Sequence, residues 1–283
     1  MLHQLKNIDE AAALQNTYGS GIALRTSYSA LISHLIPDRI SLLKKFFSRT
    51  EERKHLAKVL AINYAQYSKP EQELIEKFGA VAFDKQMDIA EAIGENGWSL
   101  DMQNGKINFG EQVEFSFKIL GSFSRTSNLW NWAWANEEAE KDDVSLNHAY
   151  EMKSFGEKQN VDFLKLGSFE AKNIDLHLIG LTASGLLKTT GYYIADYGAG
   201  AMVFTVQNNE IPKNTEKESE RIITVFNQLI SDFDVNQKLA LKHYLAEKDY
   251  EIVEGRNKLT GIKGTNIIFA EFDNEHTLTK LNG

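Results

Sequence analysis

The chain has 283 residues, of which 42% are hydrophobic, so it can fill a sizeable core and divide into two or three units. Its formal net charge of -8 argues against nucleic-acid binding, because phosphate contacts call for an excess of Lys and Arg. The sequence contains no cysteine, which excludes disulfide bonds and thiolate zinc sites.

Neither a signal peptide nor a membrane span is predicted. The first ten residues lack the apolar stretch of a secretory signal, and no later run of about eighteen apolar residues is long enough to cross a bilayer. We therefore expect a cytoplasmic protein that does not associate with membranes.

The N-terminal part of the chain has the spacing of helices. Apolar residues recur at intervals of three and four over residues 22–93, and Pro37 and Pro70 interrupt the pattern. We expect a helical N-terminal region over residues 1–70. Its basic side chains indicate a solvated helix face or a contact surface for acidic groups. These side chains are Arg39, Lys44, Lys45, Arg49, Arg53, Lys54 and Lys58.

A second helix is predicted over residues 71–93. We expect its buried stripe to consist of Phe78, Val81, Ala82, Met87 and Ile89.

After Gly94 the spacing changes to the alternation of strands. Residues 98–101 and 106–109 flank Asn104-Gly105, a dipeptide that favours a two-residue type I′ turn. Residues 113–123 continue the alternation as a third strand, and residues 129–136 form a fourth. The pattern predicts an antiparallel meander of four strands.

The fourth strand holds three of the chain's four tryptophans, Trp130, Trp132 and Trp134. Their spacing of two places all three indoles on one face of a strand and the intervening asparagine and alanines on the other. The small face would let a helix approach closely. We expect the indoles to lie in the core, because three exposed indoles would form a costly apolar patch. A stacking platform for sugars or bases is the alternative.

Two helices and a second hairpin complete the central region. A helix over residues 145–158, with Ser145 as its N-cap, follows an acidic loop, and another helix is expected over residues 174–187. Residues 191–206 predict a hairpin that turns at residues 198–200. We expect these elements to form a central α+β domain of residues 71–210.

The C-terminal residues predict a separate unit. Residues 207–215 are polar and contain a proline, which is typical of a linker or surface loop. Two helices, over residues 216–230 and 235–247, precede strands at residues 250–254, 259–262 and 266–272. We expect a helix-plus-hairpin unit over residues 211–283. The predicted fold class is therefore α+β, with N-terminal helices, a central antiparallel meander sheet packed by helices, and a small C-terminal α+β unit.

Several motifs follow one another in order through the central region. They are Gln86, Trp98-Ser-Leu-Asp101, Gly105-Lys-Ile-Asn-Phe-Gly110, Leu120-Gly-Ser122, Trp130-Asn-Trp-Ala-Trp-Ala-Asn136, Phe155-Gly156 and the Gly191-Tyr-Tyr hairpin. Together they resemble an uncharacterised bacterial domain family, a domain of unknown function marked by the tryptophan-alanine-asparagine strand. The resemblance covers about residues 72–206. It implies a fold and carries over no established activity or catalytic residues.

Familiar catalytic motifs are missing from the sequence. There is no Gly-x-x-x-x-Gly-Lys-Ser/Thr phosphate loop, and Ser184 next to Gly185 does not belong to a Gly-x-Ser-x-Gly elbow. The seven histidines include no His-Glu-x-x-His pair, so a helix-borne zinc site has no support. We predict a non-enzymatic protein with no cofactor and no metal.

Asp101 and Asn136 are the two polar residues of the resemblance that invite a functional interpretation. Burial beside aromatic rings would raise the pKa of Asp101 and suit it to acid or base chemistry, whereas its ordinary role is that of a turn hydrogen-bond partner. The Asn136 amide would orient a ligand or serve a turn. With Trp98 and the three clustered tryptophans, these residues form the expected structural signature.

We hypothesise that the protein is a bacterial immunity protein, which binds a secreted toxin and covers its active site. An acidic surface that faces a basic toxin cleft would supply specificity and fast encounter. The carboxylates expected to contact such a partner are Glu137, Glu138, Glu140, Asp142, Asp143, Glu247, Asp249, Glu251 and Glu254. The alternatives are an enzyme of unrecognised type, with carboxylates near the aromatic sheet, and a module that binds a small ligand or another protein.

Overall fold

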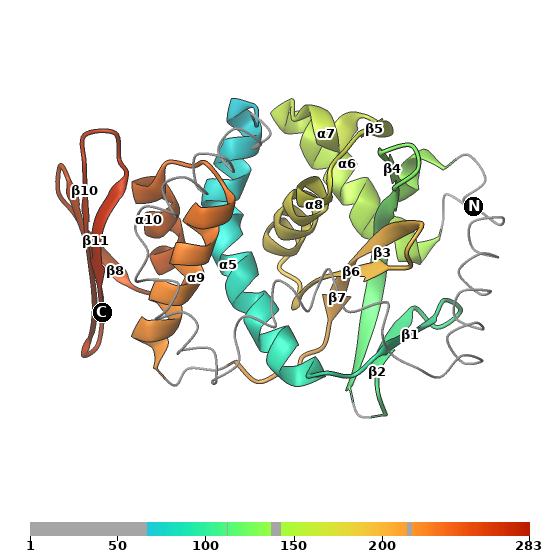
Figure 1. Ribbon diagram of the computed structural model, residues 1–283, viewed down its shortest axis with the longest axis horizontal. Coiled ribbons are helices and arrows are strands. Elements are labelled where there is room, and N and C mark those ends of the chain that lie inside the picture. The colour runs from blue at the N-terminus through green and yellow to red at the C-terminus, as the bar shows by residue number, and fades with distance from the viewer. Residues whose placement is uncertain (1–66, 112, 137–142, 214–216) are drawn as a thin grey trace.

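The computed structural model describes residues 67–111, 113–136, 143–213 and 217–283 (Figure 1). Its architecture is α+β, as predicted: a seven-stranded antiparallel sheet packed by helices, followed by helices and a four-stranded antiparallel sheet. The predicted N-terminal helices and basic side chains before residue 67 lie outside the described residues. The predicted domain boundaries at residues 70 and 210 stay predictions.

The elements of the larger layer come first along the chain. They are α5 (Lys69–Ile93), β1 (Trp98–Asp101), β2 (Lys106–Phe109), β3 (Val113–Ser124), β4 (Leu129–Trp132), η2 (Ala133–Ala135), η3 (Val144–Leu146), α6 (Asn147–Gln159), α7 (Asp162–Lys165), β5 (Ser168–Glu170), α8 (Asn173–Leu186), β6 (Gly191–Asp196) and β7 (Gly200–Gln207).

The elements of the smaller layer follow. They are α9 (Glu218–Asp232), α10 (Gln237–Glu247), β8 (Glu251–Glu254), β9 (Lys258–Lys263), β10 (Asn266–Phe272) and β11 (Leu278–Asn282). All lie close to the predicted positions except β11, which the sequence pattern did not predict.

The long strand β3 organises the seven-stranded sheet. Ser116 is paired with both Lys106 of β2 and Gln207 of β7, so these two strands lie on opposite edges of β3. Gly121 is paired with both Trp132 of β4 and Val203 of β7. Strands β2 and β4 therefore follow one another along the same edge, and the hairpin of β6 and β7 extends the sheet from the other edge. The predicted four-strand meander is present as part of this larger sheet.

A β-bulge divides β3 into two halves with opposite patterning. The register with β7 shifts between Ile119 and Gly121, so two residues of β3 face one residue of β7. Phe117 and Ile119 therefore point to one face of the sheet, whereas Phe123 points to the other. Lys118, before the bulge, shares a face with Phe123.

The tryptophan segment is a strand for only half of its predicted length. Strand β4 ends at Trp132, and the next three residues form the 3₁₀ helix η2. Trp130 and Trp132 are fully buried and paired with the half of β3 that follows the bulge, which confirms their place in the core. The prediction that Trp134 shares their face is wrong, because the chain has left the strand. The predicted alanine face is also wrong, since Ala133 is buried and Ala135 is exposed.

The β1–β2 hairpin has a longer connection than predicted. Asp101 pairs with Lys106, so the loop has four residues, 102–105, and is not a two-residue type I′ turn. Gly105 has a φ of 63°, the left-handed conformation that glycine adopts at little cost. The Asp101 carboxylate holds the loop by accepting hydrogen bonds from the backbone N–H (3.0 Å) and side-chain amide (2.7 Å) of Asn104.

Helix α6 also begins differently from the prediction. It follows the short helix η3, whose N-cap is Asp143, and the Asp143 carboxylate accepts a hydrogen bond of 2.7 Å from the Ser145 N–H; the N-cap of α6 itself is Leu146. The predicted N-cap at Ser145 is therefore wrong. The Asp143 side chain is the cap of η3 instead, because its carboxylate oxygen reaches the free N–H two residues ahead.

Helix α5 runs through the middle of the molecule, between the helices on the larger sheet and the C-terminal elements (Figure 1). The predicted single buried stripe is wrong in part: Ala82 and Ile89 are buried, but Phe78, Val81 and Met87 are only half-buried. Neighbours on both sides bury additional residues of this helix, namely Leu74, Ile75, Glu76, Gly79, Ala80, Phe83, Gln86 and Ile93.

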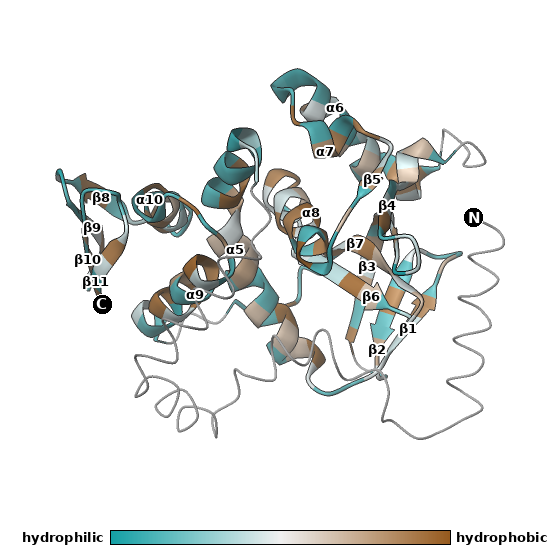
Figure 2. Cartoon of the chain, turned by 45° about the horizontal axis from the view of Figure 1, so that its top comes forward, coloured by the Kyte–Doolittle hydropathy of each residue, from teal (hydrophilic) through white to brown (hydrophobic). Residues whose placement is uncertain are grey.

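Leu229 of α9 packs directly over a glycine of α5. A Cβ at Gly79 would lie 2.5 Å from Leu229 Cδ1, so a larger residue there would displace the end of the Leu229 side chain. On the other side, α8 is apolar along much of its length and packs on the sheet (Figure 2). One continuous hydrophobic core therefore extends from the sheet through α5 to the C-terminal unit.

Charged side chains reinforce the junction between α5 and the C-terminal unit. The buried Arg221 of α9 makes ion pairs with Asp84 and, at 2.7 Å, with Asp88, both on α5. Lys248 pairs with Asp84 at 2.6 Å and with the buried Glu218 at 3.8 Å. The Arg221 guanidinium thus neutralises two carboxylates that the surrounding packing shields from most of the solvent.

We predict that Arg221→Met lowers the free energy of unfolding by about 3–5 kcal/mol, because it leaves Asp84 and Asp88 partly buried without their main counter-ion. Urea denaturation at neutral pH measures the loss. The matched control is Lys69→Gln on the exposed pair with Glu73, for which we expect a loss below about 1 kcal/mol. Equal losses in the two variants would contradict the assignment.

His177 on α8 joins the helix to the sheet. Its Nδ1 lies 3.0 Å from the Tyr192 hydroxyl on β6, and burial lowers the pKa of His177 to about 4. Between this value and the unfolded value of about 6.5, the unfolded chain binds a proton that the folded chain does not. Stability is therefore fully present above pH 6.5 and falls as the pH drops toward 4.

We predict that His177→Gln removes most of this pH dependence. A shift of about 2.5 pH units corresponds to at most about 3 kcal/mol, and the part of the ring that reaches solvent reduces it. Urea unfolding of both proteins between pH 4.5 and 7.5 measures the effect. Parallel stability curves for wild type and variant would show that His177 is not its source.

Candidate functional site

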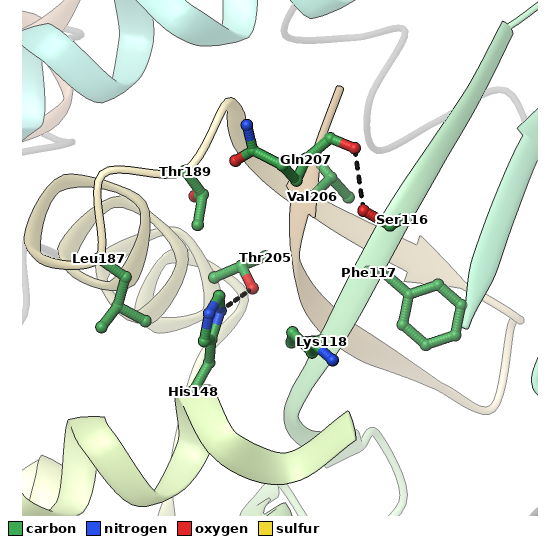
Figure 3. Close-up of a pocket in the computed structure, with 9 residues that line it drawn as sticks. All are labelled: Ser116, Phe117, Lys118, His148, Leu187, Thr189, Thr205, Val206 and Gln207. Atoms are coloured by element: carbon green, nitrogen blue, oxygen red, sulfur yellow. Dashed lines mark hydrogen bonds between the residues drawn. The ribbon is translucent and has the colours of Figure 1, made fainter. Parts of the chain in front are cut away.

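The candidate site is an open cavity of about 270 Å³ on one face of the larger sheet (Figure 3). Strands β3 and β7 form its floor, α6 forms one wall, and the segment after α8 forms another. Its polar lining residues are Ser116, Lys118, His148, Thr189, Thr205 and Gln207, and Leu187 adds an apolar side chain. The Phe117 ring points away from the other side chains (Figure 3).

The centre of the cavity is a histidine–threonine contact. Thr205 is paired with Lys118 across β7 and β3, so their side chains lie beside each other on one face. His148, in the first turn of α6, places its Nδ1 2.6 Å from the Thr205 Oγ1. Burial lowers the pKa of His148, Glu151 on the same helix raises it, and the Lys118 ammonium lowers it further. The imidazole is therefore neutral near pH 7.

Other polar groups in the lining are already engaged. Ser116 Oγ donates a hydrogen bond of 3.2 Å to the Gln207 carbonyl, and Thr189 Oγ1 donates one of 2.9 Å to the Gly191 carbonyl. The Gln207 side-chain oxygen accepts from the Thr190 N–H at 3.1 Å. The donors left to face a ligand are the Lys118 ammonium and the ring N–H of His148.

This arrangement is better suited to binding than to nucleophilic catalysis. The Thr205 side chain sits within a strand and only 1% of the residue is exposed, so its hydroxyl is shielded from a substrate. A hydroxyl nucleophile also needs a base that a third group orients, and in the part of the chain that the structure describes no carboxylate hydrogen-bonds the His148 ring. The lining of the cavity contains no carboxylate.

Asp101 lies in a turn away from this cavity. The side-chain and backbone hydrogen bonds from Asn104 lower the pKa of Asp101. That direction is opposite to the raised pKa expected of a buried general acid. The structure therefore favours the turn interpretation.

The remaining signature residues have structural contacts. Asn136 ends η2, and its N–H donates a hydrogen bond of 3.3 Å to the Ala133 carbonyl. Trp98 is half-buried and packs against the core. The Lys153 ammonium lies 4.3 Å from the centre of the Trp134 ring, a cation–π contact. The three indoles do not form a stacking platform, because Trp134 lies in η2 and not on the strand that carries the other two.

The predicted partner-binding carboxylates divide into three sets. Glu137, Glu138, Glu140 and Asp142 lie outside the described residues. Asp143 caps η3, and Glu254 makes ion pairs with Lys238 (3.0 Å) and Lys242 (2.7 Å), whose hydrogen bonds lower its pKa. Glu247, Asp249 and Glu251 are exposed around the turn from α10 to β8.

Two absences hold for residues 67–283 apart from the undescribed gaps. No group of three or more His, Asp or Glu side chains there is arranged to hold a metal ion. None of the helices in the same residues is both long enough and apolar enough to cross a membrane.

The fold defines a class of protein in which helices cover one face of an antiparallel sheet and a second small sheet follows. Residues 72–209 match the family described as "Family of unknown function (DUF6882)", and the central part of the chain belongs to this family. The match confirms the resemblance seen in the motifs. No curated protein and no solved structure matches the chain. The C-terminal unit lies beyond the matched residues.

Sequence patterns did not single out Lys118, His148 or Thr205. The residues His148 and Thr205 are 57 positions apart, and only the docking of α6 on the sheet brings them together. The one available signal was the lysine at an alternating position of a strand rich in phenylalanine. A single such residue does not distinguish a cavity from an exposed sheet face.

We predict that Trp132→Phe destabilises the fold more than Trp130→Phe. The Trp132 ring N–H donates a hydrogen bond of 2.7 Å to the buried Phe163 carbonyl, whereas the Trp130 ring N–H has no hydrogen-bond partner among the described residues. Losing the donor leaves a buried carbonyl unsatisfied, at a cost of about 1–3 kcal/mol. Chemical denaturation of both variants measures the difference, and equal stabilities would contradict it.

Proposed function

We propose that the chain is a non-enzymatic inhibitor, a cytoplasmic bacterial immunity protein that binds a basic toxin and blocks its active site. The observation that carries the proposal is the outer face of the C-terminal sheet. This face combines exposed apolar side chains with exposed carboxylates, and it lies opposite the face that packs on the helices.

Strand register places the apolar side chains together. Ile262 is paired with Ile267 on β10 and with Glu251 on β8, so the three side chains form a row across the sheet. In the next row of the same face, Val253 is paired with Thr260. Val253 and Ile267 are 54% and 53% exposed, values that are high for β-branched residues inside a sheet.

The opposite face of the same strands is covered. Leu259, Ile268 and Ala270 are fully buried, and Gly261 lies against Leu245 of α10. The helices therefore cover one face of the sheet and leave the other face exposed. An apolar centre with charged residues at its margin is the usual composition of a protein-binding surface.

The margin of this face is acidic where β8 begins. Asp249 and Glu251 lie on the turn and at the start of β8, and neither of them makes an ion pair within the described residues. Their unneutralised charge, with the net charge of -8, favours a basic partner. We call Asp249, Glu251, Val253, Ile262 and Ile267 the outer-sheet surface.

The alternative of an enzyme with carboxylates near the aromatic sheet has weaker support. Asp101 is committed to its loop, and the cavity on the larger sheet is lined without a carboxylate. A ligand-binding module remains compatible with that cavity, and such a role does not compete with inhibition because the outer-sheet surface belongs to a different layer.

The proposal predicts tight binding to the toxin encoded next to the gene of this protein, and protection of cells that produce that toxin. We expect Glu251→Lys to weaken binding at least tenfold, chiefly through slower association at low salt, and Ile267→Thr to weaken it by faster dissociation. Surface plasmon resonance at two salt concentrations separates the two effects. Threonine preserves the strand preference at residue 267.

The matched control is Glu157→Lys, which makes the same charge change on an exposed residue of α6. We expect it to bind and protect like the wild type. Absence of binding and protection by the wild-type chain would refute the inhibitor proposal. Equal weakening by Glu157→Lys and Glu251→Lys would refute the assignment to the outer-sheet surface.

A further inference from the structure

We propose that the cavity between β3, β7 and α6 is a binding site for a small oxyanion, the phosphate or carboxylate head of a small molecule. This inference is independent of the inhibitor proposal, because the cavity lies within the family-matched residues 72–209 and the outer-sheet surface lies beyond them.

Charge is the first reason. The cavity brings together Lys118 and His148, and its lining supplies no acidic side chain to either of them. Lys118 forms no ion pair with any residue in the part of the chain that the structure describes. The carboxylate that raises the pKa of His148 is Glu151, one turn along α6, and it is outside the lining. An anion held between the two side chains would supply the missing counter-charge.

Hydrogen-bond capacity is the second reason. The contact of 2.6 Å between His148 Nδ1 and Thr205 Oγ1 occupies one ring nitrogen. When Thr205 donates in this contact, the other ring nitrogen carries a hydrogen, and that donor is left for a ligand. The Lys118 ammonium adds up to three donors. The hydroxyls of Ser116 and Thr189 already donate their hydrogens to backbone carbonyls, so the hydrogens left for a ligand are those of Lys118 and His148, which favour an acceptor.

Size and shape limit the ligand. The volume of about 270 Å³ is just below the range of about 300–1,000 Å³ typical of drug-sized ligands, so a small molecule fits and a polymer does not. Leu187 offers apolar surface for a short carbon chain next to the charged head. Figure 3 shows Leu187, Thr189 and His148 on the side of the cavity that faces Lys118 and Val206.

The test uses the His148 ring as its own reporter. A bound oxyanion stabilises the protonated imidazole, so the pKa of His148, now lowered by burial and by Lys118, should rise. The groups that act on this ring are Glu151 from α6 and Lys118 from β3. NMR titration of the labelled full-length chain follows the ring signals with inorganic phosphate, with butyrate, and with chloride, each at a constant ionic strength of about 0.15 M.

We expect saturable shifts of the His148 signals and a higher pKa with phosphate or butyrate, and neither with chloride. A response to phosphate alone assigns a phosphoryl head, and a response to butyrate alone assigns a carboxylate head with an apolar tail. If neither anion produces more than the chloride response, the proposal is overturned.

Two variants separate binding from a general effect of charge. Lys118→Met should weaken anion binding at least tenfold, and it should raise the pKa of His148 in the absence of anion, because a repelling charge has been removed. Lys106→Met removes a lysine from the neighbouring strand that pairs with Glu114 at 2.7 Å and does not line the cavity. It should leave anion binding unchanged. Equal weakening in the two folded variants would overturn the site.

Discussion

Arg221 occupies the position on which the arrangement of the two layers depends. Its guanidinium faces two carboxylates of α5, while the apolar side chains around it exclude much of the water that would otherwise solvate them. Buried carboxylates without a partner are strongly destabilising, so α5 and α9 are held in one relative position. Helix α5 is also the first element of the family-matched segment, and through Arg221 that segment is tied to a C-terminal unit outside the match.

The bulge in β3 has a comparable effect on the larger sheet. Before the bulge, the helix-covered face carries Ser116 and Lys118; after it, the same face carries Phe123 against the buried indoles. Helices α6 and α7 seal the apolar half, where Trp132 donates to the Phe163 carbonyl. The polar half cannot be sealed in the same way, because a lysine and buried hydroxyls need partners. The cavity is the space that this change of pattern leaves.

The two proposals use different properties of the chain. The outer-sheet surface is open and mixed in character, with β-branched side chains beside carboxylates, and this composition suits a protein partner. The cavity is small and lined by donors, which suits an oxyanion. The two surfaces lie in different layers, and α5 is a helix that touches both layers.

The sequence by itself determined the local structure of this protein: its class, the order of its central strands, the two C-terminal helices and the burial of Trp130 and Trp132. These features follow from the spacing of apolar residues, which acts over a few neighbouring positions. Where the spacing of residues and tertiary packing favoured different structures, the prediction from spacing was wrong. The helix at Trp134 replaced a predicted strand, α5 was buried on several sides instead of one, and β11 was missed because its alternation is weak.

Only the tertiary structure decided which side chains meet. The family motifs identified about residues 72–206, close to the matched 72–209, and nothing in their spacing indicated that Lys118 and His148 share a cavity or that Arg221 binds Asp84. The same holds for the exposed row of Glu251, Ile262 and Ile267, which depends on the register of three strands. Sequence patterns report which face of an element is apolar, whereas contacts between distant elements depend on how those faces pack, and that packing is a property of the whole fold.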